Sequence, residues 1–265
     1  MADLRLRADN LLEDQIIDVE TRVLVSMRVD GTIIPKTPTA HVLGFIPGTA
    51  GLSERSGQLN SNMIMVIAPY DNPPSDVDGL FRPAANSGAS GVAVMLEAIR
   101  TIQESGYEPY KTLLFVAYSG EGLEGGEMVS IPDPSKLLQA RSSFVNNVTL
   151  EAVVHLRGLG AGTSNQLALT TSGSQRLASL FESAAHQTGV DTIRVDEGVD
   201  LRLVFETTAR GQGQEAPQIG LSWHGWESNR GTPDDTPEKI STSKLEQAGR
   251  TLGLALMILG RETEY

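Results

Sequence analysis

The chain contains no cysteine, which excludes disulfide bonds, thiolate nucleophiles and cysteine-bound metal clusters. Aromatic residues make up only 5% of its 265 residues, and no stretch approaches the roughly 18 consecutive apolar residues of a membrane span. Basic residues are also in the minority, since 21 Lys and Arg face 33 Asp and Glu, for a formal net charge of -12. This acidic balance argues against sequence-independent binding to nucleic acid or anionic lipid, and we expect neither as a partner.

Apolar runs and periodic patterns alternate along the rest of the chain, which is 40% hydrophobic. Continuous apolar runs at 63–68, 112–118 and 151–156 predict buried strands, and shorter or alternating segments at 19–29, 41–48 and 218–223 predict further strands. Apolar residues spaced i, i+3, i+4 and i+7 predict helices over 92–102, over 174–188 and after 242. The proline-punctuated segment 31–40 is predicted to be a turn, and residues 189–215 show no clear pattern.

These elements predict an α/β fold, a three-layer sandwich with a mostly parallel, mixed central sheet and helices on both faces. The strand–helix–strand order between 63 and 118 implies a right-handed parallel crossover. We predict a single domain over residues 1–265, in which 1–17 form a lead-in segment. Loops at the carboxyl ends of parallel strands are where such folds gather their functional groups.

Several common catalytic motifs are missing. The segment GLGAG at 158–162 follows a predicted strand, but Thr163 stands where a dinucleotide-binding fingerprint needs glycine. G-x-S-x-G, the P-loop and H-E-x-x-H do not occur, and no two of the four histidines have helical metal-ligand spacing. The sequence therefore gives no support to nucleophile-elbow hydrolases, P-loop enzymes or helix-borne zinc proteases.

Four blocks in order carry a resemblance to a known family. They are HVLGFIPG, SGASGVAVMLEAIR, KTLLFVAYSGEG and TPDDTPEKISTSKLEQAGR. Together they resemble the co-catalytic zinc aminopeptidases of family M28, whose relatives include glutaminyl cyclases and the peptidase-like domains of nicastrin and the transferrin receptor. The resemblance implies a zinc-exopeptidase-like α/β fold and a metal site at the ends of the strands.

The positions that the resemblance assigns to the zinc ligands hold other residues. The His, bridging Asp, Glu, Asp and closing His of the family fall on residues that mostly lack a ligand atom: Pro69, Ser87, Gly122, Arg157 and Gly231. Only two acids of the family's site persist, Asp71 beside the first ligand position and Glu121 at the place of the general base. A catalytic zinc needs about three His or carboxylate ligands from the protein, so we predict that zinc and every other cofactor are absent.

Arg157 is the one new charge at these positions. A guanidinium stays protonated and can bind carboxylates through two hydrogen bonds. We therefore hypothesise that Arg157 replaces the metal ions as the local cation and pairs with Asp71, Glu121 or both.

Two further interpretations concern binding. Trp223, His224 and Trp226 lie where the family has its substrate pocket and could form a recognition surface, although side chains that merely pack over the core are the alternative. Overall, the sequence favours a non-catalytic aminopeptidase-like domain that binds an unknown protein or small ligand. The alternative is an active metallohydrolase with a rearranged site built from Asp71, Glu121 and His155. No signal peptide is visible, yet non-catalytic members of the family favour an extracytoplasmic location within a larger protein.

Overall fold

The computed structural model describes residues 21–24, 37–40, 42–49, 62–70, 83–118, 149–172, 174–195 and 216–261. Its strands are β1 (Thr21–Leu24), β2 (Thr37–Ala40), β3 (Val42–Ile46), β4 (Asn62–Pro69), β5 (Thr112–Tyr118), β6 (Thr149–Leu156), β7 (Leu167–Ser172), β8 (Thr192–Val195) and β9 (Gln218–Trp223). The helices are a π-helical turn η1 (Ala85–Ala89), α2 (Ser90–Glu104), α4 (Gln175–Gln187), two 3-10 turns η2 (Trp226–Asn229) and η3 (Pro237–Lys239), and α5 (Thr242–Leu259).

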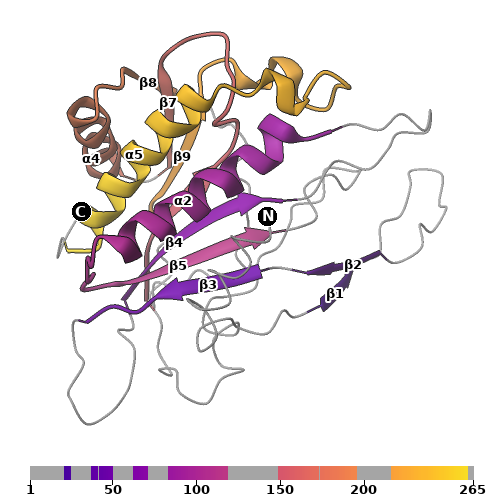
Figure 1. Ribbon diagram of the computed structural model, residues 1–265. Helices are drawn as coiled ribbons and strands as arrows, with labels where there is room; N and C mark the ends of the chain where they lie inside the picture. The colour runs from indigo at the N-terminus through magenta and orange to yellow at the C-terminus, as the bar shows by residue number, and fades with distance from the viewer. Residues whose placement is uncertain are drawn as a thin grey trace.

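Seven of these strands form one mixed sheet in the order β3-β5-β4-β6-β9-β7-β8 (Figure 1). The central pairs β5-β4, β4-β6 and β6-β9 are parallel, whereas β3 and β7 run antiparallel to β5 and β9. The crossover from β4 through α2 to β5 is the parallel unit that the sequence predicts. The mixed α/β fold class is confirmed.

The two faces of the sheet carry separate apolar clusters. On one face, Val66, Val154 and their neighbours pack against α2, α4 and α5, which lie side by side in Figure 1. On the other, Met65, Val116 and Val153 belong to a second cluster. Within the described residues, all the α-helices cover the first face, so the expected helical layer on the second face stays a prediction.

Local sequence explains where the helices begin. Ser174 and Ser241 are the N-cap residues of α4 and α5, and the hydroxyl of each accepts a hydrogen bond from the backbone N–H three residues later. Helix α2 has no such side-chain cap and instead continues directly from η1. The hydrogen bond from the Gly158 N–H to the Asn86 carbonyl and the contact of η1 with β4 place η1 where β4 and β6 end.

One prediction from the sequence is wrong. The segment 37–40, expected to lie in a turn, is strand β2, which pairs antiparallel with β1 from Thr21↔Ala40 to Leu24↔Thr37. Pro38 lacks an N–H for strand pairing, but a two-stranded ribbon leaves each strand one unpaired edge, where proline is tolerated. The expected lead-in segment 1–17 lies outside the described residues.

Candidate functional site at the strand ends

Strands β4, β5 and β6 end together, as the parallel order requires. Pro69 pairs with Tyr118 in the register of β4 and β5, and the Tyr70 N–H donates to the Tyr118 carbonyl at 2.9 Å. After β6, the Arg157 N–H donates to the carbonyl of Leu221 in β9 at 3.1 Å. The parallel order of the strands therefore brings Pro69, Tyr118 and Arg157 to the same end of the sheet.

The Arg157 side chain extends across the end of β4. Its Nη2 donates a hydrogen bond to the Tyr118 Oη at 2.8 Å, although β4 lies between β5 and β6 in the sheet. Neighbouring strands are about 4.8 Å apart, so this contact spans roughly two strand spacings. The guanidinium thus lies over the Pro69 end of β4. Asp71, Glu121 and Gly122 lie outside the described residues, and the pairing of Arg157 with either acid stays a prediction.

A buried carboxylate joins the segments that meet near these strand ends on the helical face of the sheet. Asp235 is only 1% exposed, and its Oδ1 accepts a hydrogen bond from the Asn86 N–H at 2.6 Å. Its Oδ2 accepts two more, from the Ser87 N–H at 3.1 Å and from the Ser87 hydroxyl at 2.7 Å. These three donors come from the N-terminal end of η1, 148 and 149 residues away in sequence. Asp235 therefore fastens the segment before α5 to the start of η1 and α2.

Asn86 joins the same turn to the loop after β6. Its Oδ1 accepts hydrogen bonds from the backbone N–H groups of Gly160 and Ala161, both at 2.8 Å, and its Nδ2 donates to the Ala161 carbonyl at 3.1 Å. Ser90 adds a second link, because its hydroxyl accepts from the Leu159 N–H at 2.9 Å. Sequence reasoning did not assign roles to Asn86 or Asp235. The only signal was their position: Asp235 lies inside a block that resembles the family, and Asn86 directly precedes another.

His155 lies in β6 two residues before Arg157, so the two side chains are on the same face of the sheet. It is buried, and its Nε2 is 2.7 Å from the Gln218 Oε1 on the neighbouring strand β9. Burial, above all, and the charge of Arg157 lower its pKa to about 4, against a smaller opposing effect of the Gln218 hydrogen bond. His155 is therefore neutral at physiological pH.

The three proposed recognition residues separate into two kinds. Trp223 is fully buried and donates from Nε1 to the Leu159 carbonyl at 2.9 Å, and Trp226 is 3% exposed. The packing interpretation thus describes both indoles. His224 between them is exposed and is the one member of this trio that presents its side chain to solvent.

Gly231 has a backbone conformation that favours glycine. Its φ of 67° lies in the left-handed region, where an L side chain is strained. A histidine could not replace it without that strain.

Comparison with known proteins identifies the family. A family model described as Peptidase family M28 matches residues 50–256, which is well over half of the chain. The chain belongs to peptidase family M28.

Solved structures of similar fold include a glutaminyl cyclase and two aminopeptidases. A glutaminyl cyclase from an Acidobacteriales bacterium has a TM-score of 0.62 at 15% identity, over 98% of this chain and 84% of that one. A leucine aminopeptidase precursor from Bacteroides thetaiotaomicron has a TM-score of 0.59 at 15% identity, over 97% and 87%. The zinc aminopeptidase BSAP from Bacillus subtilis has a TM-score of 0.60 at 19% identity, over 88% and 53%. At these identities the likeness shows the shared fold.

The zinc that this peptidase family implies does not fit the described residues. Pro69 and Gly231 offer no side-chain ligand atom, the Ser87 hydroxyl donates to Asp235, and Arg157 is a cation. In the described ranges, no group of three or more His, Asp or Glu side chains could hold a metal ion. His155 has its Nε2 against Gln218. Within its described residues, the donor set of this M28 chain is thus unlike that of a zinc site.

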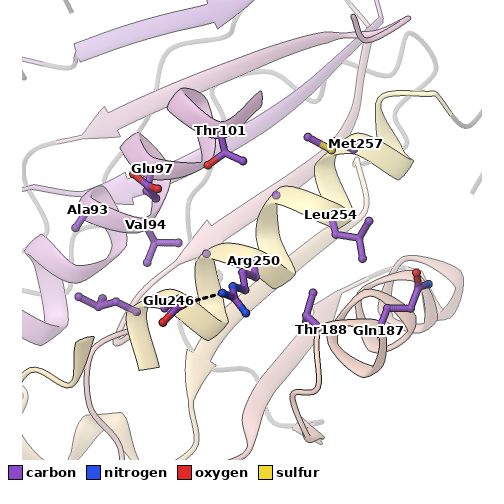
Figure 2. Close-up of a pocket in the computed structure, with 13 residues that line it drawn as sticks. Ala93, Val94, Glu97, Thr101, Gln187, Thr188, Glu246, Arg250, Leu254 and Met257 are labelled. Carbon is purple, nitrogen blue, oxygen red and sulfur yellow. Dashed lines mark ion pairs between the residues drawn. The ribbon is translucent and has the colours of Figure 1, made fainter. Parts of the chain in front are cut away.

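Two hollows border helix α2. The larger, about 870 Å³, lies between α2, α5 and the end of α4, where Figure 2 shows Arg250 paired with Glu246. The smaller, about 310 Å³, lies between α2 and the edge strand β3. No helix in the described part of the chain is long and apolar enough to cross a membrane.

Proposed function

We propose that this M28 domain is non-catalytic and that its fold serves to bind a protein or small ligand. The observation that carries the proposal is the contact between Arg157 and Tyr118 across the end of β4. The positive charge of Arg157 then lies at the strand ends, where the family resemblance expects two zinc ions. Cations in a partly buried setting repel each other, which disfavours metal binding there.

The hydrogen bonds of η1 support the same proposal. A catalytic site keeps polar groups directed at the substrate, whereas the side chains of Asn86, Ser87 and Asp235 are all directed at one another or at nearby backbone. Their hydrogen bonds stabilise the turn between β4 and α2. We infer that the residues at these strand ends no longer bind a metal ion and instead stabilise the contacts between the surrounding loops.

An active metallohydrolase is the competing function. It would need Asp71, Glu121 and His155 to bind a metal ion together. Binding at Nε2 of His155 would break the contact with Gln218, and the ion would lie near the guanidinium two residues away. Both effects disfavour metal binding at His155.

Metal analysis combined with activity assays tests the proposal. The protein is purified without chelators, its zinc content is measured, and it is assayed with zinc on amino-acid amides and on peptides with N-terminal glutamine. We expect substoichiometric zinc and no turnover in either assay. Stoichiometric zinc together with turnover that Glu121→Gln abolishes would overturn the proposal, provided that the matched variant Glu124→Gln retains the turnover.

The proposal includes an extracytoplasmic location, which the family resemblance favours. Fractionation of cells that express the full-length protein, followed by immunoblotting, tests this part. Recovery with cytoplasmic markers would contradict it.

A further inference from the structure

The smaller hollow, here called the β3–α2 pocket, lies between helix α2 and strand β3. Strand β3 is an edge strand of the seven-stranded sheet (Figure 1). Its volume is about 310 Å³, within the range of sites for small ligands. Helix α2 contributes Met95, Leu96, Ile99 and Gln103, and strand β3 contributes its whole length from Val42 to Ile46. Among the described residues, no charged side chain lines it. A ligand in this pocket would therefore be neutral and largely apolar.

Gly44 creates the space. Side chains alternate along a strand, so Val42, Gly44 and Ile46 share one face of β3, and Ile46 belongs to the cluster that packs against α2. A Cβ built on Gly44 would meet no atom within 4 Å. Glycine inside a strand weakens the strand and often marks a place where a ligand approaches closely. The missing side chain leaves a gap between β3 and α2.

Apolar side chains at the pocket remain exposed. Within the described residues, the large hydrophobic side chains that are exposed are Val42 at 49%, Tyr70 at 41%, Leu96 at 48% and Tyr110 at 46%. The first three of them line this pocket. Such a concentration of exposed apolar surface beside a cavity is typical of a binding site.

Gln103 provides one polar group. Its Oε1 is buried and has no hydrogen-bond partner, and the residue lines the pocket at the C-terminal end of α2. A buried acceptor without a partner is costly, and a ligand that donates a hydrogen bond would remove that cost. The lining of the pocket is thus apolar, and a rotation of the Gln103 side chain would present its Oε1 to a ligand at one end.

We propose that the β3–α2 pocket binds a neutral small molecule with an apolar body and one hydrogen-bond donor that reaches Gln103. An engineered apolar cavity of about 150 Å³ holds benzene, so about twice that volume suits a two-ring or similarly sized aliphatic body. The inference goes beyond the proposed function, because it holds whether or not the domain is catalytic.

Calorimetric titration with 2-naphthol and naphthalene tests the pocket, since the two probes differ by one hydroxyl donor. We expect the wild-type protein to bind both and to bind 2-naphthol about tenfold more tightly, as one hydrogen bond predicts. Gly44→Val fills the gap with a residue that suits strands and should abolish binding of both probes. Gly44→Ala adds a single methyl group and should retain binding.

A second variant examines the acceptor separately. Gln103→Leu keeps a similar volume and should remove the preference for 2-naphthol while naphthalene still binds. Thermal unfolding of each variant checks that the fold persists. Wild-type protein that binds neither probe, as expected if the pocket takes only a partner's side chain, would overturn the proposal. Binding that Gly44→Val leaves unchanged, as expected if the probes occupy the larger hollow, would also overturn it.

Discussion

Asp235 shows how a single side chain can connect distant parts of this chain. Its carboxylate accepts three hydrogen bonds from Asn86 and Ser87 and is almost completely buried. In Asp235→Asn an amide N–H group would face these donors and leave at least one of them unsatisfied. We expect a loss of about 3 kcal/mol in the free energy of unfolding, measured by urea denaturation.

The neighbouring acid provides the control for that measurement. Asp234 is exposed and its side chain has no place in the network around η1. Asp234→Asn removes the same charge and should change the free energy of unfolding by no more than about 0.5 kcal/mol. Equal effects of the two substitutions would show that the hydrogen bonds of Asp235 do not stabilise the fold.

His155 makes the stability depend on pH. Its pKa is about 4 in the folded protein and 6.5 ordinarily, so the unfolded chain binds a proton that the folded chain does not bind between these values. Stability should therefore fall as the pH is lowered from 6.5 to 4, by up to about 3 kcal/mol, and this contribution should level off below 4.

His155→Gln isolates the contribution of this side chain. The variant cannot titrate, so the difference in unfolding free energy between it and the wild type should shrink as the pH falls from 7 to 4.5. Urea denaturation at several pH values measures this difference. A difference that stays constant across the range would show that His155 titrates normally in the folded protein.

At the scale of elements, helix α5 contains a glycine whose replacement by alanine should stabilise the protein. Gly249 lies in the middle of α5 and borders the larger hollow, and a Cβ on it would meet no atom within 4 Å. Because glycine is about 1 kcal/mol less favourable than alanine inside a helix, Gly249→Ala should stabilise the protein by about that amount. Thermal and urea unfolding measure the gain. A loss of stability would mean that the methyl group of alanine disturbs the packing of α5 beside the hollow.

The elements that the sequence predicted share strong local signals. Strand β5 was expected at 112–118 and lies at Thr112–Tyr118, because a fully buried strand is a continuous apolar run. Helices α2 and α5 were visible from their apolar periodicity. Strands β7 and β8 were not predicted, since LALTTS and TIRV are short and partly polar, and their strand form depends on pairing with β9 and with each other. Tertiary pairing of this kind leaves little trace in local sequence.

At the scale of the whole molecule, some features of the candidate site could be predicted from the sequence and others could not. That Pro69 and Arg157 lie at the same end of the sheet followed from the parallel order of their strands, whereas the contact of Arg157 with Tyr118 did not. The contacts among Asn86, Gly160 and Asp235 did not follow, because they join segments 74 to 149 residues apart through side-chain geometry. Polar residues in loops carry no periodic pattern, so their partners become apparent only in the folded structure.

The response to zinc tests whether the whole fold has lost its metal. A zinc ion held at 100 times its dissociation constant would stabilise the folded state by about 2.7 kcal/mol, which raises the Tm of a domain of this size by roughly 5–10 °C. We expect neither added zinc nor a chelator to shift the Tm, because Pro69, Arg157 and Gly231 supply no ligand. Zinc could also bind at exposed histidines, and His186→Gln removes one of them, on helix α4. A zinc-dependent rise in Tm that persists in His186→Gln and disappears in Glu121→Gln would show that the strand ends still hold a metal ion, and the non-catalytic proposal would then fail.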